Sequence, residues 1–275
     1  MTIQTAFDEA AACGLYDLTA EELARRFAGN PPLGHWFAYG DHGEPTGVAV
    51  ATERADGRIF VVHRLGVEAA FGPLLERALA DVAGTVNVNV GAGQVDRRRD
   101  VEALGLTLEL TGVGYDVPFT PLLERLPELR GDGRFEIVPV IDVDPDELFD
   151  LDTGLRGAVP GNDGWRGNRA WFDDEMSSPE FDPSGYHVAI DAEGRLVGLC
   201  RMWRNDDGPA LGMLGVRRGW RTGFVALELL RATVAGSSGW GWPTFSTHTA
   251  RPGLQRRLER VGATRSGGFL RFVRQ

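Results

Sequence analysis

The chain carries the same succession of strand and helix patterns twice. In the second half, a strand–turn–strand pattern over Gly194–Val216 precedes a helix, a further strand and a last helix–strand pair. The first half shows this succession from Glu44, and the triplet Leu-Gly-Val closes the second strand both times, at Leu65–Val67 and Leu214–Val216. At 275 residues, the chain also has the length of two average domains. The repeat therefore predicts two domains of similar fold.

The second copy holds a segment that the first copy lacks. This segment is RRGWRTGF (Arg217–Phe224), and it leads into a predicted helix over Val225–Gly239. Its glycines permit tight backbone turns, and its arginines add positive charge. Backbone N–H groups at a helix N-terminus bind phosphate groups well. The segment is therefore a candidate anion-binding loop in the second half alone, and the alternative is an exposed basic loop that caps a helix.

Local patterns place the other elements and a linker. Pro118–Glu136 reads as the linker, with a short helical run over Leu122–Leu129, and it divides the chain into domains 1–130 and 131–275. Asp144 is a plausible N-cap. In the second half the expected elements are a β-like run Phe135–Val143, helices Asp144–Leu155 and Arg169–Met176, antiparallel strands Gly185–Asp191, Arg195–Trp203 and Pro209–Val216, the helix after the loop, and a strand Pro243–Ala250.

Composition excludes several classes of function. The formal net charge of −10 disfavours nonspecific nucleic-acid binding, and it suits either a cationic substrate or solubility alone. No apolar run approaches the roughly 20 residues that cross a bilayer. The N-terminal segment lacks the features of a secretory signal. Cys13 and Cys200 lack metal-ligand spacing and are expected to be reduced, buried thiols. We expect a cytoplasmic protein without a metal, a nucleic-acid partner or a membrane partner.

The order of elements, together with Val216–Leu230, resembles the GNAT superfamily of N-acetyltransferases over nearly the whole chain. In that family a loop with the pattern (Gln/Arg)-x-x-Gly-x-(Gly/Ala) wraps the pyrophosphate of acetyl-CoA, and Arg221–Ala226 falls in register with it. The arrangement is similar to two-domain members such as mycothiol synthase. The resemblance implies an α/β (α+β) fold of two tandem GNAT-like domains, each a mixed, mostly antiparallel sheet flanked by helices. The first domain would be degenerate, without the pyrophosphate loop.

The resemblance further implies acetyl-CoA as the acyl donor. One residue departs from the pattern, because Phe224 stands at the place of the central glycine. If its side chain points into the sheet, its N–H can still donate to the donor; if it points at the ligand, binding is weakened. The residues expected to bind the donor are Met213, Leu214, Gly215, Val216, Arg221, Thr222, Gly223, Phe224, Val225 and Ala226.

The usual catalytic residues of the family have no match here. Leu258 stands where members often have a tyrosine, and Arg251 stands where an asparagine is common. The candidates for proton transfer are His248, Ser246 and Thr249, on the strand Pro243–Ala250, with Thr247 or water as further possibilities. A histidine titrates near neutral pH, so His248 can take a proton from an ammonium through water. The alternative is a hydrogen-bonded strand histidine. Strand alternation predicts Ser246 and His248 on one face and Thr249 on the other.

The acidic segment Trp171–Asp182, with Asp163 upstream and with the aromatic residues Trp165, Trp171 and Phe172, lies where family members build the acceptor pocket. Carboxylates beside aromatic rings can hold a cationic amine, whereas the alternative is a solvated acidic helix end. Arg201 and Arg204 mark either a sheet edge or a site for a substrate carboxylate. The residues expected to bind the acceptor are Asp163, Trp165, Asp173, Asp174 and Glu175.

These observations favour an acyl-CoA-dependent N-acyltransferase that transfers directly to a small amine-bearing molecule in the C-terminal half. The alternative is a catalytically inactive tandem GNAT fold that binds or sequesters a small cationic ligand. A third hypothesis, aminoacyl transfer from charged tRNA, is opposed by the acidic charge. The protein is expected to be a monomer or a homodimer.

Overall fold

Strands and helices follow the repeated order that the sequence predicts. The computed structural model describes residues 1–29, 31–54, 57–126, 133–159, 162, 165–220 and 224–274. Within these residues, twelve strands form one mixed, mostly antiparallel sheet in the order β1-β2-β3-β4-β5-β12-β6-β11-β10-β9-β8-β7. This confirms the predicted fold class. None of the described helices is both long enough and apolar enough to span a membrane.

The two halves can be compared element by element. The first half contains β1 (Thr2–Gln4), α1 (Glu9–Tyr16), α2 (Ala20–Gly29), β2 (Gly34–Tyr39), β3 (Pro45–Glu53), β4 (Ile59–Leu65), α3 (Phe71–Asp81), β5 (Val86–Gly91), α4 (Val95–Ala103) and β6 (Thr107–Pro118), and α5 (Phe119–Arg125) follows. The second half repeats this order as β7 (Phe135–Pro139), α6 (Pro145–Arg156), α7 (Arg169–Met176), β8 (Tyr186–Asp191), β9 (Leu196–Asn205), β10 (Gly208–Val216), α8 (Val225–Ser237), β11 (Thr244–Thr249), α9 (Pro252–Arg260) and β12 (Thr264–Arg274). The predicted repeat is confirmed.

Local sequence accounts for most of these bounds. Asp144 caps α6, because its Oδ1 accepts a hydrogen bond from the N–H of Asp146 at 2.7 Å. Helix α7 has the bounds that the sequence predicts. The run Phe135–Val143 was expected to be extended throughout, but β7 ends at Pro139 and a 3₁₀ turn follows. Proline cannot donate to the sheet, so the strand stops there. The predicted helical run Leu122–Leu129 begins earlier, as α5, and residues 127–132 lie outside the described part.

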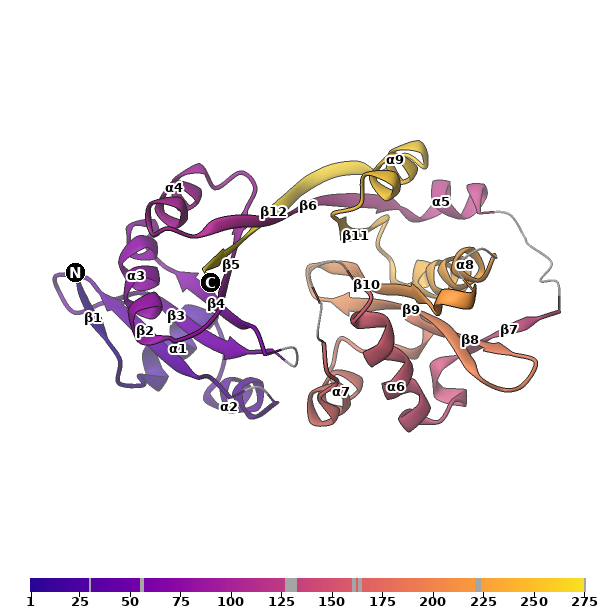
Figure 1. Cartoon of the computed structure of the whole chain (residues 1–275), viewed down its shortest axis with the longest axis horizontal. Helices are drawn as coiled ribbons and strands as arrows, with labels where there is room; N and C mark the ends of the chain where they lie inside the picture. Colours follow the sequence, from indigo (N-terminus) through magenta and orange to yellow (C-terminus); the bar gives the residue numbers. More distant parts are fainter. Residues whose placement is uncertain are drawn as a thin grey trace. The chain divides into compact units, whose positions relative to one another are not determined.

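The chain divides into two compact units, of which unit 1 comprises Met1–Thr111 and Gly268–Gln275. Helices cover both faces of its strands (Figure 1). Alternation along β2 directs Trp36 and Ala38 toward α3, while Phe37 and Tyr39 face α1 and α2. A strand that is buried on both faces is apolar throughout. Residues 47–51 of β3 are buried and apolar in this way.

Unit 2 comprises Gly112–Gly267 and has the same layers. Helices α6 and α7 cover one face of its strands, where Leu151 and Phe172 pack against Tyr186 and Leu199. Helix α8 covers the other face, where it packs against Cys200 among others (Figure 1). These two faces are called the α6/α7 face and the α8 face below. Cys200 is buried and Cys13 is partly buried, and both are free thiols.

Each unit takes one strand from the opposite half of the sequence. In unit 2, β11 pairs antiparallel with β6, from Thr244 opposite Pro118 to Thr249 opposite Val113. In unit 1, β5 pairs antiparallel with β12, the last strand of the chain. The compact units therefore have other bounds than the predicted domains 1–130 and 131–275, which divide the chain at the end of the first sequence repeat.

Candidate functional site

Two parallel strands of unit 2 diverge next to a bulge. Among the described residues, the pairing of β10 with β11 is confined to Ala210 opposite Ser246, although both strands continue beyond it. On its other side β10 pairs with β9, and the register shifts between Leu211 and Met213. The shift moves Leu211 to the α8 face and Met213 to the α6/α7 face. A bulge bends its strand, so β10 turns away from β11 at Gly212.

Close packing explains why glycine stands at the bulge. A Cβ atom added at Gly212 would lie 2.5 Å from Nε1 of Trp203, so the indole ring rests directly on the β10 backbone. A Cβ atom at Gly215 would lie 3.0 Å from Cδ1 of Leu155 in α6. Both distances are shorter than ordinary van der Waals contacts. The sequence did not reveal the bulge, because it depends on how Trp203 packs.

The three predicted catalytic residues lie on both faces of β11. Ser246 and His248 are exposed on the face opposite the buried Phe245, whereas Thr249 is buried on the same side as Phe245. The hydroxyl of Thr249 accepts a hydrogen bond from the N–H of Arg251 at 3.1 Å. The structure therefore brings Ser246 and His248 together and separates Thr249 from them.

A carboxylate that the sequence reasoning missed shares the face of these two residues. Asp116 lies directly opposite Ser246 in the antiparallel pair of β6 and β11. The hydroxyl of Ser246 donates to the carbonyl of Pro209 at 3.4 Å. On the other face, Tyr115 donates to Glu259 at 3.1 Å. Both Asp116 and Tyr115 come from the first half of the sequence, so only knowledge of the strand exchange reveals them.

The predicted donor-binding residues follow the diverging strand into helix α8. Met213 and Val216 are buried, and Leu214 and Gly215 are partly accessible. Arg221, Thr222 and Gly223 lie outside the described residues. Phe224 is the N-cap of α8 and its side chain is 55% exposed, whereas Val225 is buried against the sheet. Phe224 therefore does not point into the sheet, which is the orientation that was expected to preserve donor binding.

The start of α8 lies at the same end of the sheet as the divergence. Helix α8 begins shortly after β10 ends at Val216. The first N–H groups of an α-helix lack partners within the helix, and the helix dipole makes that end positive. The N–H groups of Leu227 and Glu228 already donate to the carbonyl of Phe224, so Val225 and Ala226 are the candidates to donate to an anion at this end of β10.

On the α6/α7 face, two of the predicted acceptor-binding carboxylates, Asp173 and Glu175, are already paired with arginines. Asp173 accepts from Nε of Arg169 at 2.7 Å. Glu175 accepts from Nη2 of Arg156 at 2.8 Å and from Nη1 of Arg201 at 3.2 Å. Asp174 is exposed, and Asp163 lies outside the described residues. Glu175 therefore belongs to a largely buried ion cluster with Arg156 and Arg201, whereas the pair of Asp173 with Arg169 is exposed.

Aromatic rings complete this cluster. The rings of Trp165 and Trp171 lie 5.6 Å apart. The guanidinium of Arg156 lies over both, 5.6 Å from the ring centre of Trp165 and 4.8 Å from that of Trp171. The aromatic pair that was expected to hold a cationic amine thus holds an arginine of the chain itself. The role of Arg156 was missed because, in the sequence, it resembles any solvated arginine at the end of a helix.

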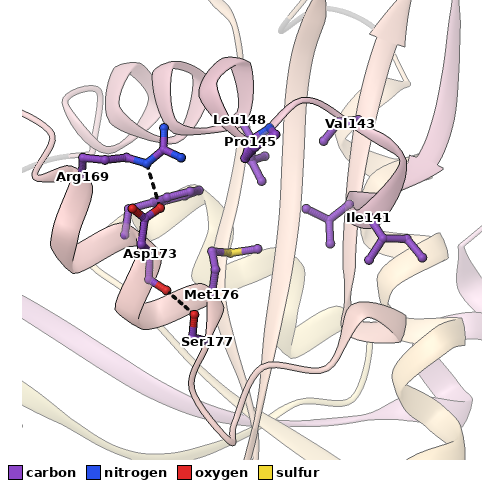
Figure 2. A pocket seen from close by; sticks show the side chains of 10 residues that line it. Ile141, Val143, Pro145, Leu148, Arg169, Asp173, Met176 and Ser177 are labelled. Atoms are coloured by element: carbon purple, nitrogen blue, oxygen red, sulfur yellow. Dashed lines mark hydrogen bonds and ion pairs between the residues drawn. The ribbon is translucent and has the colours of Figure 1, made fainter. Parts of the chain in front are cut away.

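A hollow of about 480 Å³ lies outside this region. It is formed by the 3₁₀ turn after β7, the start of α6, and α7. Figure 2 shows Ile141 and Val143 on one side of it and the paired Arg169 and Asp173 on the other. None of the residues described as lining it belongs to β9, β10 or β11, so this hollow is separate from the divergence.

Comparison with solved structures shows the same architecture. A GCN5-related N-acetyltransferase from Sphaerobacter thermophilus matches 99% of this chain and 95% of its own, with a TM-score of 0.67 and 17% identity. A tandem GNAT protein from the clavulanic acid biosynthesis pathway matches 99% of this chain and 98% of its own, with a TM-score of 0.70 and 14% identity. The chain has a tandem GNAT fold. In sequence, no family model and no curated protein matches it.

The likeness to GNAT proteins spans both units. A GNAT-family acetyltransferase from Colwellia psychrerythraea covers 100% of this chain and 100% of its own, with a TM-score of 0.56 and 14% identity. The identities are low, so these structures establish the tandem GNAT fold. The catalytic chemistry depends on the residues of this chain itself.

In the first GNAT-like unit, side chains fill the corresponding divergence. The parallel pairing of β4 with β5 runs from Ile59 to Val61, and β4 continues beyond it. There Arg97, at the start of α4, forms an ion pair with Glu68 and places Nη1 2.7 Å from Nε2 of His63. The guanidinium of Arg97 also lies 5.4 Å from the ring centre of Phe71. These contacts occupy the end of β4 in unit 1.

His63 predicts a loss of stability in mild acid. Burial lowers the pKa of His63 to about 4, and the charge of Arg97 lowers it further. Between pH 6.5 and 4, His63 binds a proton in the unfolded chain but not in the folded chain. The free energy of unfolding therefore falls as the pH falls through this window. From pH 7 to pH 5 the expected loss is about 1–2 kcal/mol. In His63→Gln this part of the loss should be absent, as measured by urea denaturation at both pH values.

His42 provides the control for this prediction, because it is exposed in the turn between β2 and β3. His42→Gln should keep the pH dependence of the unmodified chain. If His63→Gln shows that same dependence, His63 does not supply the acid sensitivity.

Proposed function

We propose that the chain is an acyl-CoA-dependent N-acyltransferase, with acetyl-CoA as donor and a small amine-bearing molecule as acceptor. Transfer would take place where β10 and β11 diverge in unit 2. The observation that carries the proposal is the combination of a single residue pair between these strands with a bulge at Gly212. The tandem GNAT fold, which supports acyl transfer in general, agrees with it.

The donor side is supported by unused backbone groups. Beyond Ala210, the edge of β10 that faces β11 has no strand partner among the described residues. Such an edge can form strand-like hydrogen bonds with an extended ligand that carries amides, as the pantetheine arm of CoA does. The N-terminus of α8, with the loop before it, suits the pyrophosphate. The exposed side chain of Phe224 is a feature that opposes donor binding at this helix start. Acetyl-CoA would supply the thioester.

The acceptor side is supported by groups that share one face of the sheet. The attacking amine has to lose a proton, and a histidine at neutral pH can accept it through a water molecule. His248 and Ser246 lie on β11 with Asp116 next to them on β6. We assign proton transfer to His248 and positioning to Ser246. The buried Thr249 accepts a hydrogen bond from the N–H of Arg251, just before α9, and we assign it no direct part.

The alternative function is a GNAT-like binding protein without catalysis. It is favoured by Leu258, which is packed into the core at the position where the family often has a tyrosine. Together with the transferase function, we propose a cytoplasmic location, a monomer or homodimer, and no nucleic-acid or membrane partner.

Titration calorimetry with acetyl-CoA tests the donor site. We expect micromolar binding at about one site per chain, similar binding of desulfo-CoA, and weaker binding of ATP. Arg221→Ala should weaken acetyl-CoA binding roughly 10-fold, because a charge-assisted hydrogen bond to phosphate is lost. Arg99→Ala is the matched control, since Arg99 is an exposed arginine in the middle of α4. Equal affinity of the two variants contradicts the assigned donor site.

Release of free CoA thiol in the presence of an amine panel separates the two functions. Amine-dependent release supports transfer. Tight donor binding without any amine-dependent release supports the binding protein instead.

A further inference from the structure

The ion cluster on the α6/α7 face contains a buried arginine that uses little of its hydrogen-bonding capacity. Arg201 on β9 is 2% exposed. Its side chain has one described hydrogen bond, from Nη1 to Oε2 of Glu175 at 3.2 Å, and that oxygen also accepts from Arg156 at 2.8 Å. A guanidinium has five N–H donors in a planar fork that matches a carboxylate. Within the described structure, Glu175 satisfies Arg201 only weakly.

Three polar atoms around Arg201 are buried without a hydrogen-bond partner. They are Nε of Arg201 itself, the hydroxyl of Tyr186 and Oδ1 of Asp152. Tyr186 lies directly opposite Arg201 in the pairing of β8 with β9, and burial keeps the pKa of its hydroxyl well above the ordinary value. A buried polar group without a partner costs about 1–3 kcal/mol, so three of them in one cluster need an explanation. Two are donors close to a cation, and that is the composition of a site for an anion.

The cluster lies beside the proposed place of transfer. Arg201 is paired across the sheet with Met213, the residue that follows the bulge. The guanidinium of Arg201 lies 4.3 Å from the ring centre of Trp203, and that ring rests on Gly212. Adjacent strands are about 4.8 Å apart. An acceptor whose amine reaches the divergence can therefore place a second group, a few bonds away, at Arg201.

Glu175 is the natural competitor for such a group. The two arginines, Arg156 and Arg201, are balanced by Glu175 and Asp152, so the cluster is neutral as it stands. The side chain of Glu175 is 18% exposed and belongs to the last turn of α7. Asp152 is more deeply buried in α6. Glu175 can therefore rotate into solvent and release Arg201, while Asp152 keeps Arg156 paired.

We infer that the acceptor carries a carboxylate close to its amine, as an amino acid or an amino-acid-like acid does, and that Arg201 binds this carboxylate. Glu175 holds Arg201 in the free chain and gives way when the acceptor binds. The identity of the amine as the acceptor rests on the proposed function, whereas the binding of a carboxylate does not.

The test uses the full chain and a panel of L-amino acids, each beside its own primary amide. Binding is followed without acyl-CoA through the indole N–H signal of Trp203 in ¹H–¹⁵N spectra, assigned from Trp203→Phe. We expect at least one acid to shift this signal and its amide to leave it unchanged. Arg201→Met should weaken binding of that acid at least about 10-fold, because a bidentate charged contact is lost. Arg204→Met is the matched control, since Arg204 is 53% exposed and pairs with Asp182.

Glu175→Gln distinguishes a binding site from an ion cluster that only supports the fold. If Glu175 competes with the ligand, this variant should bind the acid about 3–10-fold more tightly. The neutral glutamine holds Arg201 less strongly, so the state in which Arg201 can bind the acid is populated before the acid arrives. A purely structural cluster gives no such gain. Arg201→Lys serves as the second variant if Arg201→Met fails to fold, and it should also bind the acid more weakly.

The outcomes separate this inference from the proposed function. Equal shifts with acids and amides, no shift with any acid, or no gain in Glu175→Gln overturns the inference. Binding of an acid without release of CoA thiol supports the carboxylate site and contradicts the transferase. Equal thiol release with acids and amides supports the transferase and overturns the carboxylate site.

Discussion

A fragment covering residues 112–267 is expected to fold, whereas a fragment covering residues 131–275 is not. The fragment 131–275 contains every strand and helix of the second repeat but lacks β6. Without β6, β11 keeps, among the described residues, only the pair of Ser246 with Ala210. The core also loses Tyr115, Val117 and Phe119, all of which are buried. At about 1.5–3 kcal/mol for each buried side chain, the loss rivals the whole stability of an ordinary domain, about 5–15 kcal/mol.

The fragment 131–275 cannot repair this loss with its own last strand. Counted from the first residue of each strand, Arg274 of β12 falls at the position of Val117 in β6, and Val273 falls at that of Asp116. Such a replacement would bury a guanidinium in an apolar core and expose a valine, and an unpaired buried charge costs several kcal/mol. Circular dichroism and urea denaturation of both fragments test this. A peptide covering residues 107–126 should restore a cooperative transition to 131–275, and equal cooperativity without it contradicts the strand exchange.

Gly236→Ala is expected to lower the free energy of unfolding by about 1–3 kcal/mol. Gly236 lies in α8 and packs against the 3₁₀ turn Pro183–Gly185. A Cβ atom at this position would lie 2.0 Å from the backbone carbonyl oxygen of Ser184. A backbone atom cannot turn aside as a side chain does, so α8 has to shift away from the sheet. This cost outweighs the gain in helix propensity of about 1 kcal/mol. Urea denaturation of the full chain measures the effect.

Gly154 in α6 is the matched control. An added Cβ atom there meets nothing within 4 Å. Gly154→Ala should therefore stabilise the chain by about 0.5–1 kcal/mol, through helix propensity and the reduced entropy of the unfolded state. If Gly236→Ala matches Gly154→Ala in sign, α8 does not lie against the turn as described.

Most of the fold was predictable because it depends on local patterns. The cap at Asp144, the bounds of α7 and the strand–turn–strand repeat each follow from residues within a few positions of one another. The strand exchange was not predictable in this way. Strands β6 and β12 are both amphipathic and both follow a similar helix, so the local pattern does not say which of the two pairs with β11. The choice depends on whether Val117 or Arg274 fits the core.

The candidate site was predictable where it depends on strand alternation. Ser246 and His248 share a face and Thr249 lies on the other, as alternation predicts. The acidic, aromatic segment was harder to interpret, because its partners Arg156 and Arg201 come from other elements and only the folded chain brings them together. Arg201 was noted as a candidate for a substrate carboxylate, and the roles of all these residues stay predictions.

The exchange of strands reverses the order in which the two units can be finished during synthesis. Domains generally fold as units, with the N-terminal one first as the chain grows. Here the N-terminal unit needs β12, which pairs with β5 and is translated after every other strand and helix of the two units. The C-terminal unit needs β6, which has been made long before. Unit 1, which begins first, is therefore completed after unit 2, and a ribosome that stalls before residue 268 releases a chain in which unit 1 lacks the part of β12 that pairs with β5.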